Sequence, residues 1–119
     1  MSRQYFFFRS NGMLERMDIE AIIALEAHDN YVKFIAETYS SMVRVSLESA
    51  LAQLPGDMFV QITRSLAVSL DRIRIVGKDF VMLGPDLDTQ VPVSKKYYPE
   101  LIKKIKIIDE SPASTSKTR

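Results

Sequence analysis

The chain has 119 residues, a length that fits one domain. Apolar residues make up 46%, charged residues 26%, and the formal net charge is +1, which is ordinary globular usage and excludes global disorder. With no cysteine and one histidine, the sequence excludes disulfides, thiolate metal sites, thiol catalysis and metal sites built from several histidines.

A hairpin is predicted at the start of the chain. Two short strands flank Asn11-Gly12, the dipeptide that most strongly favours a two-residue turn. The following residues keep a period of two, which is typical of strands. The strands expected in this half are residues 5–9, 13–17, 22–27, 31–35 and 42–45.

One internal helix is predicted between the two sets of strands. Ser46 can cap its start, apolar residues then recur on one face, and Pro55-Gly56 ends it. Further strands are expected at residues 59–62, 66–68, 73–76, 80–83 and 89–93. The predicted fold class is therefore mainly β, with short antiparallel sheets, one internal helix and a C-terminal helix.

The C-terminal helix is expected to begin at Pro99, because proline cannot donate to a carbonyl four residues back and favours an extended residue before it. Residues 94–98 are expected to form an ordered turn. The apolar residues at helical spacing are Leu101, Ile102, Ile105 and Ile108. From Asp109 on, small polar and basic residues dominate, so one domain is predicted over residues 1–108 and a disordered tail over 109–119.

Motifs of catalysis are absent from the sequence: the glycines are scattered and no carboxylate pair lies in a recognisable pattern. Glu26, His28 and Asp29 could imitate a metal or acid–base cluster, but such a loop is more often solvated or turn-forming. No apolar run approaches the roughly 20 residues of a membrane helix, and the N-terminus does not fit a signal peptide. We therefore expect no enzyme, no cofactor, no membrane partner and a cytoplasmic location.

Three short polar segments, residues 26–31, 62–66 and 93–97, each adjoin a predicted strand. Asparagine can pair with adenine, arginine or lysine can pair with guanine, and serine and backbone N–H groups suit phosphates. Their spacing leaves open whether the segments converge. The late group of basic residues is also typical of a solvated helix face; its members are Lys95, Lys96, Lys103, Lys104 and Lys106.

These segments, taken in order, resemble the LytTR DNA-binding domain. The stretches that carry the resemblance are DIEAIIALEAHDNYV (18–32), VRVSLE (43–48), FVQITRSLAVSLDRI (59–73) and VPVSKKY (91–97). Each is weak alone, but four in the expected order are fairly specific. The likeness covers residues 5–106.

The resemblance implies short antiparallel sheets and loops that enter successive major grooves of double-stranded DNA. It also implies a bacterial transcription regulator, bound as a homodimer to repeated half-sites. Carried over residue by residue, the DNA-contacting positions fall in three groups. They are Asn30 with His28 and Tyr31, Arg64 with Thr63 and Ser65, and the pair Lys95 and Lys96.

The sequence departs from the family pattern at three places. Thr63 stands where many members have histidine, Ser69 where asparagine is usual, and lysines stand where arginines are common in the last segment. Lysine lacks the planar fork of arginine, so weaker base specificity is expected there. An alternative function is a protein-interaction module that scaffolds or inhibits a regulator without binding DNA, with exposed Tyr97 and Tyr98 as anchors.

Overall fold

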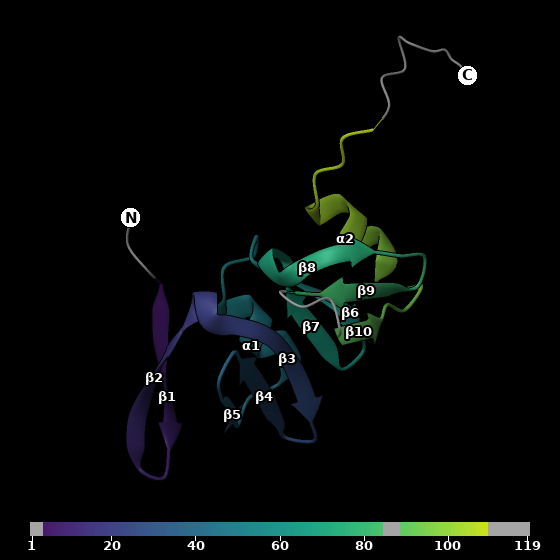
Figure 1. Cartoon of the computed structure of the whole chain (residues 1–119). Coiled ribbons are helices and arrows are strands. Elements are labelled where there is room, and N and C mark those ends of the chain that lie inside the picture. The colour runs from purple at the N-terminus through teal and green to yellow at the C-terminus, as the bar shows by residue number, and fades with distance from the viewer. Residues whose placement is uncertain (1–3, 85–88, 110–119) are drawn as a thin grey trace, which may run out of the picture.

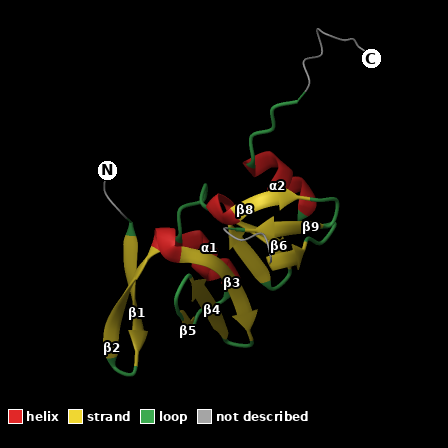
Figure 2. Cartoon of the chain, in the orientation of Figure 1, coloured by secondary structure: helices red, strands yellow, loops and turns green. Residues whose placement is uncertain are grey.

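Ten short strands form three antiparallel sheets in residues 4–84 and 89–109, the part of the chain that the computed structural model describes (Figures 1 and 2). The strands are β1 (Tyr5–Ser10), β2 (Met13–Asp18), β3 (Ile22–His28), β4 (Tyr31–Ala36), β5 (Ser40–Val43), β6 (Phe59–Thr63), β7 (Leu66–Ser69), β8 (Ile73–Val76), β9 (Phe80–Leu83) and β10 (Thr89–Pro92). The helices are α1 (Leu47–Gln53), α2 (Tyr98–Lys104) and the single 3₁₀ turns η1 (Ile19–Ala21) and η2 (Leu70–Arg72). The predicted mainly β fold class is confirmed.

The five-stranded sheet, in the order β5-β4-β3-β7-β6, is the middle layer of the molecule. Side chains alternate along β3, so that buried Leu25 and Ala24 belong to different core clusters. The first cluster joins this sheet to the β1–β2 hairpin and α1. The second joins it to the sheet β10-β9-β8 and α2. Both faces of the middle sheet are therefore covered.

The predicted hairpin forms at the start of the chain. Asn11 and Gly12 both have positive φ, 52° and 78°, as a two-residue primed turn requires. On the inner side of the hairpin, Phe8 and Met17 are buried in the first core cluster. The β1–β2 pair therefore stands beside the body and is held by these inward side chains.

Helix α1 follows the prediction closely. The Ser46 side-chain oxygen accepts a hydrogen bond from the Ser49 backbone N–H at 3.0 Å, which caps the first turn. Leu47 and Ala50 are buried, and the helix ends at Gln53, two residues before Pro55. The turn that links α1 to β6 is thus where the sequence places it.

Strand β5 lies two residues earlier than predicted. It pairs with β4 as far as Val43, opposite Val32, and β4 itself begins at Tyr31. Arg44 and Val45 alternate as a strand would, but the ladder between β5 and β4 ends at Val43, so neither residue belongs to the strand. The expected span 42–45 is therefore wrong at both ends.

The C-terminal helix begins one residue earlier and ends sooner than the apolar spacing predicts. Tyr98 already donates its N–H to the Ser94 carbonyl at 3.1 Å. Ile105 has extended backbone angles, and Ile108 is 90% exposed, so neither continues the helix. The predicted tail lies outside the described residues beyond Asp109. None of the described helices has the length and apolar composition needed to cross a membrane.

Candidate nucleic-acid interface

The first candidate segment is the tight turn between β3 and β4. Asp29 has a φ of 53°, which is the turn-forming role expected of this polar loop. His28 Nε2 lies 2.9 Å from Glu26 Oε1 across the same strand face. Asn30 is exposed, and Tyr31 is 39% exposed with the Arg44 guanidinium carbon 5.9 Å from its ring centroid. The turn thus presents its polar side chains to solvent.

The second segment is the turn between β6 and β7, which carries Arg64 and Ser65. The Thr63 hydroxyl oxygen accepts from the Ser65 backbone N–H at 3.2 Å. The Gln61 side-chain amide donates to the Thr63 carbonyl at 3.0 Å and to the Arg64 carbonyl at 3.2 Å. These bonds fix the turn backbone while the Arg64 side chain stays exposed.

The third segment follows β10. Buried Val93 anchors it in the second core cluster. The Ser94 carbonyl then accepts from the backbone N–H groups of Tyr97, at 3.0 Å, and Tyr98, so the predicted ordered turn forms. Lys95 and Lys96 are exposed on this turn, and Lys96 Nζ lies 5.5 Å from the Tyr97 ring centroid.

Backbone hydrogen bonds bring the three segments to one end of the middle sheet. The Ala27 N–H donates to the Ser65 carbonyl at 2.8 Å, and the Ser94 N–H donates to the Ile62 carbonyl at 2.8 Å. The second segment therefore lies between the first and the third, at the lower end of the sheet in Figure 1. We call this surface the recognition edge. Its members are residues 28–31, 63–65 and 94–97.

Two further residues of this region belong to no motif, so the sequence does not indicate a role for them. Gln61 holds the second turn, and its only signal is that it shares a strand face with Thr63. Lys78 is exposed in the turn between β8 and β9, which the Val93 N–H joins by a 2.8 Å bond to the Asp79 carbonyl. A fourth turn, which exposes one basic and one acidic side chain, thus adjoins the recognition edge.

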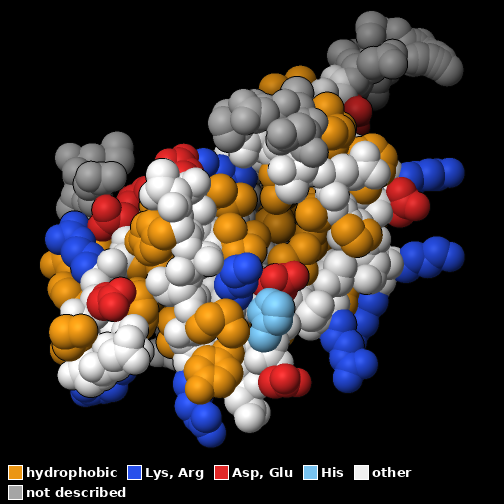
Figure 3. All heavy atoms as spheres, turned by 60° about the horizontal axis from the view of Figure 1, so that its bottom comes forward, with side chains coloured by type: hydrophobic (Ala, Val, Ile, Leu, Met, Phe, Trp, Pro, Cys, Tyr) orange, Lys and Arg blue, Asp and Glu red, His pale blue; other side chains and the backbone are white. Residues whose placement is uncertain are grey.

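The charges of the recognition edge are mainly basic and exposed. Within the described part of the chain, Arg64, Lys95 and Lys96 form no ion pair with an acidic side chain, whereas Glu26 lies against His28. Figure 3, turned so that the lower end of Figure 1 comes forward, shows basic side chains projecting from this face with acidic ones between them. Among residues 4–84 and 89–109, no cluster of three potential metal ligands occurs.

Two expectations about the C-terminal region are corrected. Tyr97 and Tyr98 are half-buried rather than exposed, and Tyr98 packs against the second core cluster. Lys104 does not belong to a freely solvated face, because its ammonium donates to the carbonyls of Gly56 at 2.6 Å and Phe59 at 3.3 Å. The tyrosines and this lysine therefore hold α2 in place.

Ser69, which replaces the usual asparagine, is buried just before η2. Its side chain makes no capping hydrogen bond to that turn. The η2 turn forms nonetheless, since the N–H of Ile73 donates to the Leu70 carbonyl. The departure thus affects one local hydrogen bond and leaves the fold intact.

Comparison with known proteins places this arrangement in a family. The model of the LytTr DNA-binding domain matches residues 13–106. The chain belongs to this family. LytTr domains are a DNA-binding family and not an enzyme family, so DNA is the partner class and transcription regulation the general role.

A solved structure agrees with this assignment. The LytTr DNA-binding domain of a response regulator from Bacillus cereus superposes with a TM-score of 0.70 at 23% identity, over 87% of this chain and 97% of the other. At that identity the likeness shows the fold. A search of curated proteins gave no match.

Proposed function

We propose that the protein regulates transcription by binding double-stranded DNA sequence-specifically, with the turns of the recognition edge entering successive major grooves. The observation that supports this is the pair of backbone hydrogen bonds, Ala27 to Ser65 and Ser94 to Ile62, that sets the three polar turns side by side. Turns on one edge can follow a duplex, whereas turns on opposite faces could not. The site would lie in the bacterial cytoplasm, where such a regulator meets its DNA.

Each turn has a distinct part in the proposal. Asn30 offers an amide that can pair with adenine, and Arg64 offers the planar fork that pairs with guanine. Lys95 and Lys96 supply point charges for phosphates and weaker base contacts. The supporting positions are His28, Tyr31, Thr63 and Ser65.

Thr63 acts in this proposal first through the protein backbone. Its oxygen already accepts from the Ser65 N–H, so it orients the turn that presents Arg64. The hydroxyl hydrogen remains able to donate to a phosphate oxygen. The exchange of histidine for threonine therefore replaces a base-reading ring by a turn-forming hydroxyl.

Two copies of the chain would read a repeated site. One recognition edge covers a short block of sequence, and a second copy on the same side of the duplex reaches a block about one helical turn away. We therefore propose a homodimeric arrangement on DNA.

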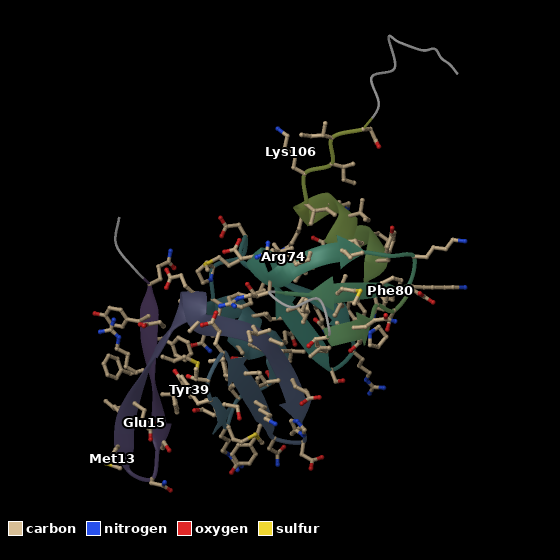
Figure 4. All side chains as sticks on the ribbon, viewed as in Figure 1. Met13, Glu15, Tyr39, Arg74, Phe80 and Lys106 are labelled. Atoms are coloured by element: carbon tan, nitrogen blue, oxygen red, sulfur yellow. The ribbon has the colours of Figure 1, made fainter. Side chains whose placement is uncertain are left out.

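Selection of bound duplexes from a random library tests the function. The expected result is enrichment of two similar short blocks, spaced by about one helical turn. Arg64→Ala should lose the enriched sequence, while Lys106→Ala, which removes a charge at the opposite end of the molecule (Figure 4), should retain it. A library recovered without enrichment, or equal loss in both variants, would contradict sequence-specific reading by this edge.

A further inference from the structure

A groove of about 1030 Å³ separates the hairpin from the body of the molecule. Its walls are β1, the residues at the end of β5 and the C-terminal end of α1, and none of the β2 residues lines it. The apolar lining residues include Phe6, Phe8, Phe34, Val43 and Leu54. None of the residues of the recognition edge lines this groove, so it is a separate surface.

Two strand edges border the groove without a partner strand in the described part of the chain. β1 pairs with β2 alone, and β5 is the last strand of the five-stranded sheet. In a hairpin closed by a two-residue turn, Ser10 and Met13 form a hydrogen-bonded pair, and such pairs alternate along the ladder. Phe7 and Arg9 therefore turn their backbone N–H and C=O groups toward the free edge of β1.

These backbone groups restrict what can fill the groove. A purely apolar molecule would remove water from them without replacing its hydrogen bonds, which is costly. An extended peptide would pair with them as an added strand while its alternate side chains reach the apolar floor. The edge thus favours a peptide over a small hydrophobic ligand.

The charge of the groove indicates which kind of peptide it would bind. Arg9 and Arg44 line it, and its described lining contains no acidic residue. A segment that alternates apolar and acidic residues would place one set of side chains on the aromatic floor. Its other set would face the two arginines.

We propose that this groove binds an extended, alternating apolar–acidic segment of a partner protein as an added β-strand on β1. The inference does not depend on DNA binding, because the groove and the recognition edge share no residue. It also relocates the protein-contact surface from Tyr97 and Tyr98, which are half-buried, to the hairpin.

A labelled peptide of about eight residues that alternates valine and glutamate tests the proposal by fluorescence anisotropy and amide NMR. We expect saturable binding, with shifts in residues 4–9 and 43–45 and slowed hydrogen exchange of the Phe7 amide. The valine–lysine counterpart should bind at least about tenfold more weakly. Shifts confined to the recognition edge, or equal binding of both peptides, would overturn the proposal.

Variants of the hairpin separate the backbone contribution from the side chain. Phe7→Pro removes a donor from the free edge, whereas Phe7→Ala keeps it, so only the first should abolish peptide binding. Cross-strand contacts between β1 and β2 check that the proline variant is folded. If the hairpin is lost in that variant, hydrogen exchange of the Phe7 amide in the unaltered protein decides whether the peptide pairs with β1. Equal peptide binding by the folded proline and alanine variants would overturn strand addition.

Charge and ligand controls complete the test. Arg9→Glu should weaken binding of the valine–glutamate peptide about tenfold, and Lys106→Glu should leave it unchanged. Decanoate serves as an apolar anion that cannot pair with a strand edge. If decanoate saturated the groove at concentrations where the peptide did not bind, the assignment to a peptide would be wrong.

Discussion

The recognition edge and the hairpin groove present opposite kinds of surface. At the edge, backbone groups are bonded within the protein, as between Ala27 and Ser65, and polar side chains project outward. At the groove, aromatic and aliphatic side chains lie beside Arg9 and Arg44, and among the described residues no strand pairs with the outer edge of β1. The first surface suits a partner that is read through side chains, and the second suits a partner that pairs with backbone.

The two regions also differ in how they are supported. The second and third turns of the recognition edge rest on Ile62 and Val93, both buried in the second core cluster. The hairpin is held to the body through the first cluster by Phe8 and Met17, and a bond from the Ile19 N–H to the Gln4 carbonyl at 2.9 Å closes its open end. We therefore expect the hairpin to loosen without disturbing the second and third turns of the recognition edge.

The largest expected effect is a loss of stability on the hairpin side of the molecule alone. Met17 is fully buried, so Met17→Ala should lower the stability of the hairpin side by about 2–5 kcal/mol. Amides of β1 and β2 should lose protection from hydrogen exchange while DNA affinity changes little. Met13→Ala, at a position 61% exposed, is the matched control and should have little effect on stability. A parallel collapse of DNA binding in the Met17 variant would show that the regions are not independent.

The next effect concerns the edge alone. Arg64→Ala should lower affinity for the selected duplex by about 5- to 150-fold, since a bidentate base contact is worth about 1–3 kcal/mol. Arg16→Ala, whose guanidinium lies 3.1 Å from Asp18 on the hairpin, removes the same charge from the other region and should have little effect. Titration of both variants by anisotropy checks this, and similar losses would indicate general electrostatic attraction instead.

A smaller effect should come from the support beneath Arg64. Gln61→Leu removes two hydrogen bonds to the turn backbone, each worth about 1 kcal/mol, and leaves every exposed basic group in place. We expect a loss of base discrimination with an unchanged dependence of affinity on salt. A lower salt slope would mean that phosphate contacts were lost, and Gln61 would then act otherwise than as a positioning residue.

The smallest expected effect is a gain in DNA affinity. Glu26 is a partly exposed acid beside the first turn, with its carboxylate against His28. Glu26→Gln should raise DNA affinity about two- to fivefold at low salt, and the gain should shrink as salt screens the charge. Glu48→Gln, on the exposed side of α1, should leave affinity unchanged. An equal gain in affinity from both variants would contradict a DNA contact at the first turn.

Local rules predict much of the fold. Asn11-Gly12 indicates its turn, Ser46 its helix cap, and the spans of β8 and β9 agree with the alternation. The predictions fail where the pairing between strands sets the ends of a strand. Arg44 and Val45 have strand periodicity, but the ladder between β5 and β4 ends at Val43.

The sequence proposes residues for the candidate site but does not indicate how they are arranged in space. Asn30, Arg64 and Lys95 are indicated by resemblance, and all three are exposed as expected. Their convergence depends on bonds between residues far apart in the chain, such as Ser94 to Ile62, which no local pattern reveals. The sequence does not indicate Gln61 because a glutamine within a strand has no signature of its own.

The most direct measurement is the change in backbone amide chemical shifts when the selected duplex is added to the folded chain. We predict that the largest changes cluster in residues 28–31, 63–65 and 94–97 together, while residues 5–9 stay unchanged. Changes centred on the hairpin, or in only one of the three turns, would contradict a shared DNA-binding edge.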